Sequence, residues 1–194
     1  MFYEKYEDAK YIVFIDTETV TDQLTQIPKL WEIGIVILEN DQIVDEQDYM
    51  ISPDAQFEKL DLVYEKVSVS LEKIKNSPKF IDIYPKIKKY LNSDYIIGGH
   101  NVDYDIRVVN RELNVVSGDL IGSKKIDTLR MARTLYPKWS HHKLDNLCEE
   151  FNLNINKRHR ALDDIYATAQ AYLIMKNKII NDKNIEKSFS GGLF

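Results

Sequence analysis

The segment YIVFIDTETV, residues 11–20, constrains the fold of this chain more than any other stretch. Its apolar first half is typical of a strand buried on both faces, and the strand ends in Asp16 and Glu18. Successive strand side chains alternate between faces, so these two carboxylates point to the same side. Two negative charges so close together repel each other unless a positive group lies between them. The segment therefore predicts a buried strand whose end faces a positively charged group.

The length and charge of the chain limit the kinds of protein it can be. Its 194 residues suit one compact domain. With 26 basic and 31 acidic residues, the net charge of −5 argues against a strongly basic protein that binds nucleic acid mainly by neutralising phosphates. A nucleic-acid enzyme whose acidic residues hold metal ions stays open. Cys148 is the single cysteine, which excludes an internal disulfide and a cysteine-based zinc cluster.

The N-terminus and the apolar runs indicate where the protein works. Residues 1–10 are acidic and lack the apolar core of a signal peptide. The longest apolar runs are far shorter than a membrane-spanning helix. We therefore expect a cytoplasmic protein that does not enter a membrane.

The apolar patterns predict an α/β domain with a mixed five-stranded sheet, an antiparallel hairpin being followed by crossover strands. Its strands are expected at 11–15, 32–38, 42–51, 94–99 and 124–129. Glu39-Asn40-Asp41 makes a plausible tight turn between the second and third strands. A helical zone over about 57–91 is broken at Ser77-Pro78, because proline cannot continue a helix interior.

Three further helices are expected. The first begins near Asp103, with its inner face formed by Ile106, Val109 and Leu113. The apolar face of the second is formed by Leu144, Leu147, Cys148 and Phe151. The inner face of the last long helix is formed by Leu162, Ile165, Tyr166, Ala169, Tyr172 and Leu173. The periodicity then fades, so we place the domain at 1–178 and a flexible tail at 179–194.

Other acidic residues follow the predicted strands or begin the predicted helices. Asp105 lies in HNVDYD, just after the strand that ends at Gly98-Gly99, and Asp163 and Asp164 lie in HRALDD at the start of the last helix. Strand ends and the starts of the helices that follow them line one crevice in α/β proteins. Four converging carboxylates carry a charge of −4, which two divalent cations neutralise, and Mg²⁺ prefers such oxygen ligands. Two such ions can catalyse phosphoryl transfer.

A group that accepts a proton from the attacking water is then required. His159 precedes Asp164 by five residues, and imidazole suits a general base near neutral pH. Five positions span about 500° of a helix, so the two side chains do not share a helix face. We expect His159 in the loop before the last helix and Asp164 in its first turns.

Three motifs resemble, in order, those of the DEDDh superfamily of exonucleases, which includes the proofreading epsilon subunit of bacterial DNA polymerase III, oligoribonuclease and ribonuclease T. DTET at 16–19 is similar to the first motif, HNVDYD at 100–105 to the second and HRALDD at 159–164 to the third. Tyr104 replaces the usual Phe. The resemblance extends over roughly residues 10–175 and includes WEIGIVIL and IDT.

The resemblance implies a ribonuclease H-like fold and a metal-dependent 3′–5′ exonuclease that releases nucleoside 5′-monophosphates. It implies two Mg²⁺ or Mn²⁺ ions, with His159 as general base and the metal ligands Asp16, Glu18, Asp105 and Asp164. Asp164 fits the motif and Asp163 does not, because the family's aspartate comes five residues after its histidine. Substrate contacts are expected from the other motif residues, Thr17, Thr19, His100, Asn101 and Tyr104. Single-stranded or frayed DNA is the expected substrate, in replication proofreading or repair.

Several alternatives stay open. An exoribonuclease of the oligoribonuclease or ribonuclease T type would use the same chemistry, and a catalytically idle module could hold nucleic-acid ends or a polymerase. The family often continues its first motif as T-T-G, whereas this chain has Thr19-Val20-Thr21, and Asp103 and Asp163 add negative charge near the motifs. The chain ends in SGGLF, which resembles a degenerate clamp-binding motif of replication proteins. The alternative for this tail is a disordered end without a partner.

Overall fold

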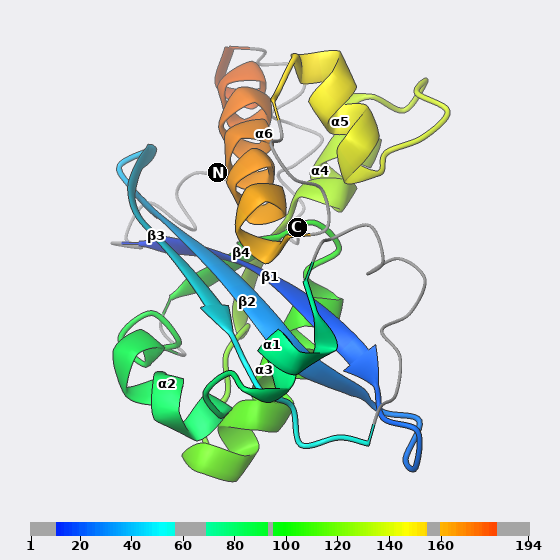
Figure 1. Ribbon diagram of the computed structural model, residues 1–194. Helices are drawn as coiled ribbons and strands as arrows, with labels where there is room; N and C mark the ends of the chain where they lie inside the picture. Colours follow the sequence, from blue (N-terminus) through cyan, green and yellow to red (C-terminus); the bar gives the residue numbers. More distant parts are fainter. Residues whose placement is uncertain (1–10, 57–68, 93–94, 155–159, 182–194) are drawn as a thin grey trace.

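The computed structural model describes residues 11–56, 69–92, 95–154 and 160–181. These residues form one five-stranded sheet between two layers of helices (Figure 1). The strand order is β3-β2-β1-β4-β5, in which β1 to β3 are antiparallel neighbours and β4 and β5 run parallel to β1. The strands are β1 (Ile12–Thr21), β2 (Pro28–Glu39), β3 (Gln42–Met50), β4 (Ile96–Gly99) and β5 (Lys124–Asp127). The predicted mixed five-stranded sheet is confirmed.

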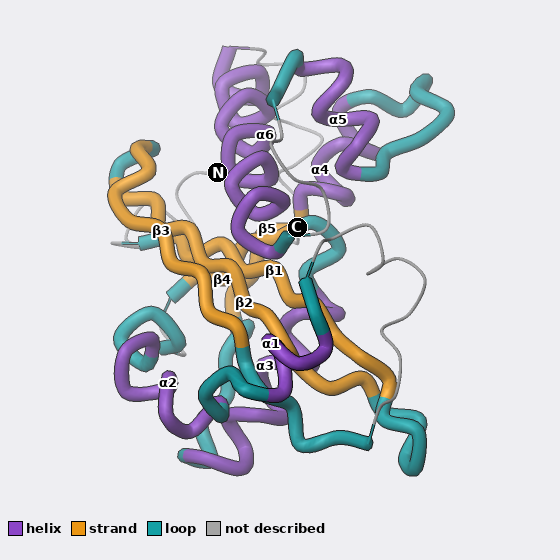
Figure 2. The backbone as a smooth tube through the Cα atoms, viewed as in Figure 1, coloured by secondary structure: helices purple, strands orange, loops and turns teal. Residues whose placement is uncertain are grey.

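The sheet is apolar on both faces, so each face packs against its own helices, as Figure 2 shows. One layer contains α4 (Thr128–Leu135), α5 (Leu144–Phe151) and α6 (Ala161–Asn181), the other α2 (Phe80–Ile87) and α3 (Asp103–Val116). Phe14 of β1 and Val36 of β2 pack beneath the first layer, whereas Val13 and Ile35 pack against the second. The period of two along each strand thus sends alternate side chains into two separate cores.

A third, smaller cluster supports the far end of the β1–β2 hairpin. There α1 (Leu71–Lys75) packs its buried Ile74 against Val20 and Trp31. The interruption of the helical zone that was expected at Ser77-Pro78 lies between α1 and α2. Residues 57–68 of the predicted helical zone lie outside the described residues.

Several boundaries differ from the sequence prediction, including the start of β2, which lies at Pro28 and not at residue 32. β1 continues past residue 15 to Thr21, because it pairs with β2 as far as Thr21 opposite Pro28. The last helix, α6, extends to Asn181. The prediction was wrong for one residue of the inner face of α6, because Tyr166 is 36% exposed.

The predicted turn between β2 and β3 is confirmed, with Asn40 and Asp41 both at positive φ in a two-residue hairpin loop. Within the described residues, no helix combines the length and the apolar character that crossing a membrane requires.

Candidate active site

Three of the four predicted metal ligands meet at one place on the sheet. Asp16 and Glu18 project from the same face of β1, and Asp164 comes from the first turn of α6. One carboxylate oxygen of each residue lies within 4.8 Å of the others. Residues from the first and third sequence motifs, about 150 positions apart, therefore form one acidic cluster.

Strand β2 brings the start of α6 close to this cluster. In the sheet, Gly34 lies opposite Asp16 and Glu32 lies opposite Glu18. A Cβ atom at Gly34 would stand 2.4 Å from the carbonyl carbon and oxygen of Ala161. Only a glycine at this position allows the first residue of α6 to lie directly on the sheet.

We therefore expect Gly34→Ala to push the first turn of α6 away from the sheet. The overpacking should cost about 1–3 kcal/mol of unfolding free energy and lower any activity of the acidic cluster. Urea unfolding measures the first effect. Gly118→Asn is a suitable control, because Gly118 has φ of +77° and open space around its missing Cβ, and asparagine tolerates that conformation. Equal stability of Gly34→Ala and the wild type would contradict this account of α6 docking.

Glu32 is a fully buried charge that the sequence analysis did not identify as part of the site. Its Oε1 atom lies 2.5 Å from Nη2 of Arg160, and its Oε2 atom accepts the backbone N–H of Ala161 at 3.1 Å. Arg160 also forms an ion pair with Asp48 of β3 at 3.1 Å. The available sequence signal was Glu32 itself, a charged residue at the start of the apolar run EIGIVIL.

The fourth predicted ligand, Asp105, approaches from the opposite face of the sheet. Its Oδ1 atom accepts the backbone N–H of Thr17 at 2.9 Å and the Thr17 hydroxyl at 2.6 Å. β4 pairs with β1 only as far as Phe14, which leaves the next part of this β1 edge open to Asp105. Thr17, predicted as a substrate contact, thus positions a carboxylate of the second motif.

The carboxylates strongly perturb one another. Burial, followed by the charges of Asp105, Glu18 and Asp164, raises the pKa of Asp16 well above its usual value. Burial raises the pKa of Asp105 to about 7, against the opposing effect of its hydrogen bonds from Thr17. Such a cluster favours a bound proton or cation. Because every ligand is a carboxylate oxygen, the site fits Mg²⁺ or Mn²⁺ better than a metal that prefers sulfur or nitrogen.

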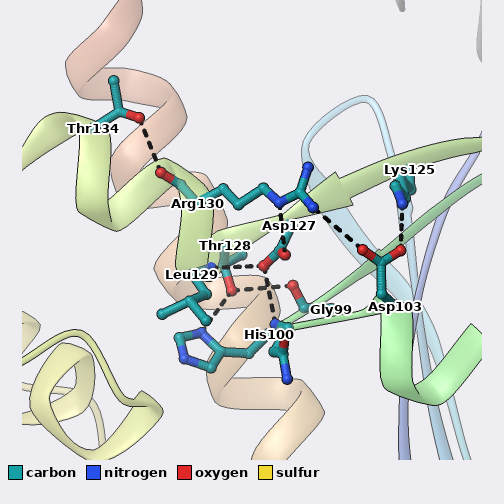
Figure 3. A network of polar contacts seen from close by, with 10 residues as sticks. Gly99, His100, Asp103, Lys125, Asp127, Thr128, Leu129, Arg130 and Thr134 are labelled. Carbon is teal, nitrogen blue, oxygen red and sulfur yellow. Dashed lines mark hydrogen bonds and ion pairs between the residues drawn. The ribbon is translucent and has the colours of Figure 1, made fainter. Parts of the chain in front are cut away.

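The turn that carries His100 and Asn101 is held by the start of α4 (Figure 3). Asp127 caps α4 by accepting the N–H of Leu129 at 3.0 Å, and it also accepts the N–H of Asn101 at 2.9 Å. Nδ1 of His100 lies 3.0 Å from Oγ1 of Thr128. The second motif is therefore fixed to α4 before the chain enters α3.

Asp103 does not add a free negative charge to the site. Its carboxylate pairs with Lys125 and with Nη2 of Arg130, the latter at 3.3 Å (Figure 3). The hydrogen bond from Lys125 is the main reason that the pKa of Asp103 lies below its usual value. The negative charge that Asp103 adds near the second motif is therefore neutralised by two cationic side chains, one from β5 and one from α4.

Two further predicted site residues, Thr19 and Tyr104, lie on or beside β1. The hydroxyl groups of Thr19 and Tyr104 are 2.7 Å apart, so these two predicted substrate contacts are joined to each other. The register between β1 and β2 shifts between Glu18 and Thr19, and such a bulge re-aims the side chains that follow it. His159 and the SGGLF tail lie outside the described residues.

The fold and this acidic cluster define a nuclease-like α/β domain, and comparison with known proteins identifies its family. The family model RNase_T, described as an exonuclease, matches residues 13–172. The chain belongs to this exonuclease family, a family of nucleases that hydrolyse nucleic acid, and its motifs are those of the DEDDh group.

Similar sequences and structures agree with this assignment. The DNA polymerase III PolC-type of Listeria welshimeri is 30% identical over 186 residues, which are 95% of this chain and 12% of that protein. The corresponding protein of Thermotoga maritima is 32% identical over 166 residues, 86% of this chain and again 12% of the relative. This chain therefore spans about an eighth of the length of these relatives.

Two solved structures show that the fold is ribonuclease H-like, as predicted. Exonuclease X in complex with 5′ overhanging duplex DNA has a TM-score of 0.66 and 23% identity, covering 86% of this chain and 92% of that one. The nuclease domain of 3′hExo, a DEDDh family member bound to rAMP, has a TM-score of 0.73 and 16% identity, covering 88% and 94%.

Proposed function

We propose that this chain is a metal-dependent 3′–5′ exonuclease that removes nucleoside 5′-monophosphates from single-stranded or frayed DNA 3′ ends. The observation that carries the proposal is the approach of Asp16, Glu18 and Asp164 to within 4.8 Å, with the negative charge of Asp105 helping to raise the pKa of Asp16. The cost of holding two buried and two half-buried carboxylates together is reasonable in a site that binds divalent cations.

In this proposal, Asp16, Glu18, Asp105 and Asp164 hold two divalent cations, Mg²⁺ or Mn²⁺. When bound, such ions activate a water molecule and stabilise the leaving 3′ oxygen of a phosphodiester. His159 accepts the proton of the attacking water. Thr19, His100, Asn101 and Tyr104 are candidates for contacts to the terminal nucleotides, and the ring of Tyr104 offers a face on which a base can stack. Thr17 supports the site through Asp105.

DNA is the preferred substrate because the PolC-type relatives are DNA polymerases by name. A role in replication proofreading or repair, beside a bacterial polymerase, would place the protein in the cytoplasm. The exoribonuclease alternative is supported by the similarity to the 3′hExo nuclease domain, which is bound to rAMP. An idle module that holds nucleic-acid ends is the third candidate, and the retention of all the motif residues disfavours it.

Cleavage of matched DNA and RNA single strands tests the proposal. The two oligonucleotides carry the same sequence and a 5′ label, and each is incubated with Mn²⁺ or with EDTA. We expect a one-nucleotide ladder that requires Mn²⁺ and forms faster on DNA. A faster ladder on RNA would support the exoribonuclease, and no cleavage of either strand by folded protein would support the idle module.

His159→Ala should lower the cleavage rate by about 10²–10⁴-fold without unfolding the protein, because a general base contributes a factor of that size. Mn²⁺ binding should persist, since the four carboxylates are unchanged. His141→Ala is the matched control, because His141 is exposed and lies outside the three motifs. Near-wild-type rates in His159→Ala would contradict the assignment of the base.

The partners follow from the proposed role. A DNA polymerase is the expected neighbour, and a sliding clamp is a second candidate through Leu193 and Phe194 at the end of the chain. Deleting these two residues should abolish binding to purified clamp if the tail is a clamp motif. Absence of clamp binding by the full chain would show that the end of the chain does not bind this partner.

A further inference from the structure

We propose that Glu32 is a positioning residue that orients the first turn of α6, and thereby Asp164, relative to Asp16 and Glu18. The proposal rests on the proposed function, because it concerns the same site. It begins from an unusual placement: Glu32 is fully buried and lies directly opposite Glu18 in the sheet, beside a cluster that is already strongly negative.

The contacts of Glu32 show what its charge does there. Nε of Arg160 donates to Oε1 at 2.7 Å and Nη2 lies 2.5 Å from the same atom, while Oε2 accepts the N–H of Ala161 at 3.1 Å. The N–H groups of a first helical turn lack partners within the helix. Glu32 therefore acts as an N-cap supplied by a neighbouring strand, 129 residues away in the chain.

Arg160 passes this restraint to the metal ligand. Its guanidinium group is held by Glu32, and its backbone carbonyl accepts the N–H of Asp164 at 3.0 Å. Arg160 thus connects β2 to Asp164, through an ion pair of its side chain and a hydrogen bond of its backbone. Arg160 also follows His159, the proposed general base, directly in the sequence.

Stability alone is a poor explanation for a glutamate at this position. A buried ion pair is often no more stabilising than apolar side chains of the same volume. Glu32 also places a further negative charge directly opposite Glu18, beside a cluster that is already acidic. Gly34, two residues further along β2, fixes how closely α6 approaches the sheet. Glu32 adds the directional contact that fixes where Asp164 points.

Mn²⁺ binding and kinetics of Glu32→Gln and Arg160→Met test the proposal. Outer partners of metal ligands contribute about 10–100-fold to affinity or activity. We expect each variant to weaken Mn²⁺ binding, measured by electron paramagnetic resonance of the free ion, by about tenfold. On single-stranded DNA, kcat should fall by a similar factor and KM should change little. The double variant should be no worse than the worse single variant, because both break one contact.

Lys176→Met is the matched control. Lys176 pairs with Asp41 and so joins the same helix to the β2–β3 turn, far along α6 from its first turn. It should lower the stability to urea while leaving Mn²⁺ affinity and kcat unchanged. Equal losses of Mn²⁺ affinity in Lys176→Met and Glu32→Gln would overturn the proposal, as would wild-type Mn²⁺ affinity and kcat in Glu32→Gln.

Two further features keep the result decisive. If Glu32→Gln does not fold, Arg160→Lys takes its place, because it keeps the charge but loses the two-nitrogen contact; it should weaken Mn²⁺ binding, and wild-type affinity would overturn the proposal. Mn²⁺ affinity is measured without nucleic acid. A wild type that binds Mn²⁺ but cuts nothing would therefore reject the proposed function, while Glu32 is still judged on affinity.

Discussion

Asp16→Asn should abolish cleavage and at the same time stabilise the metal-free protein. Removing a ligand of the proposed metal site should lower the rate at least about a thousandfold, which corresponds to roughly 4 kcal/mol of transition-state stabilisation. The same change removes a carboxylate whose pKa is raised by burial and by Asp105, Glu18 and Asp164. A neutral side chain of the same shape relieves that repulsion.

Cleavage of a labelled single strand and thermal unfolding in EDTA at pH 8 measure the two effects. Each kcal/mol of relief should raise Tm by about 2–4 °C in a domain of this size. Asp164→Asn should behave in the same way. Asp54→Asn is a control for the substitution itself, because Asp54 is exposed and lies outside the three motifs. A fully active Asp16→Asn, or one that melts below the wild type in EDTA, would contradict this account of the site.

The stability of the metal-free protein should fall as the pH rises from about 4 to 7. The pKa of Asp105 lies at about 7 and that of Asp48 at about 6, against 3.8 for an ordinary aspartate; burial is the main cause for both. Between these values the folded protein keeps protons that the unfolded chain has released. The stabilising contribution is therefore present below pH 4 and is lost as the pH rises through 6 and 7.

The expected size of this effect is large. A pKa that rises from 3.8 to about 7, as for Asp105, corresponds to a loss on the order of 4 kcal/mol once the group is fully ionised. Mn²⁺ should reverse the trend, because the metal binds the ionised carboxylates and stabilises the fold that holds them. The gain in Tm on adding Mn²⁺ should consequently grow from pH 5 to pH 8.

Thermal unfolding across this pH range, in EDTA and in Mn²⁺, measures both trends. Asp105→Asn should flatten the EDTA profile, since its side chain no longer titrates. A metal-free Tm that rises steadily from pH 5 to pH 8, or a Mn²⁺ effect that does not change with pH, would show that these carboxylates do not dominate the pH dependence.

The sequence predicted the sheet and the acidic residues of the cluster because both depend on local patterns. The apolar runs of β1 and β2 and the order of the three motifs need no knowledge of contacts. The extension of β1 to Thr21 was missed because it depends on pairing with Pro28, and the same holds for the exposure of Tyr166, which depends on what covers α6.

The supporting residues of the site were missed for a related reason. Glu32 and Arg160 are 128 residues apart, and neither carries a motif that points to the other. In the sequence, Gly34 is an ordinary strand glycine, and only the structure shows that the backbone of Ala161 packs against it. Asp103, counted as an added negative charge from the sequence, is neutralised by Lys125 and Arg130 from other elements. These contacts are properties of the three-dimensional arrangement.

The direction of digestion tests the central claim most directly. One single-stranded DNA is labelled at its 3′-terminal nucleotide and another at its 5′ end, and both are incubated with Mn²⁺ or with EDTA. In Mn²⁺ the 3′ label should be released first, as a nucleoside 5′-monophosphate, while the 5′-labelled strand shortens in one-nucleotide steps. EDTA should stop both reactions. Release of the 5′ label first, internal cuts, or no cleavage by folded protein would contradict a metal-dependent 3′–5′ exonuclease.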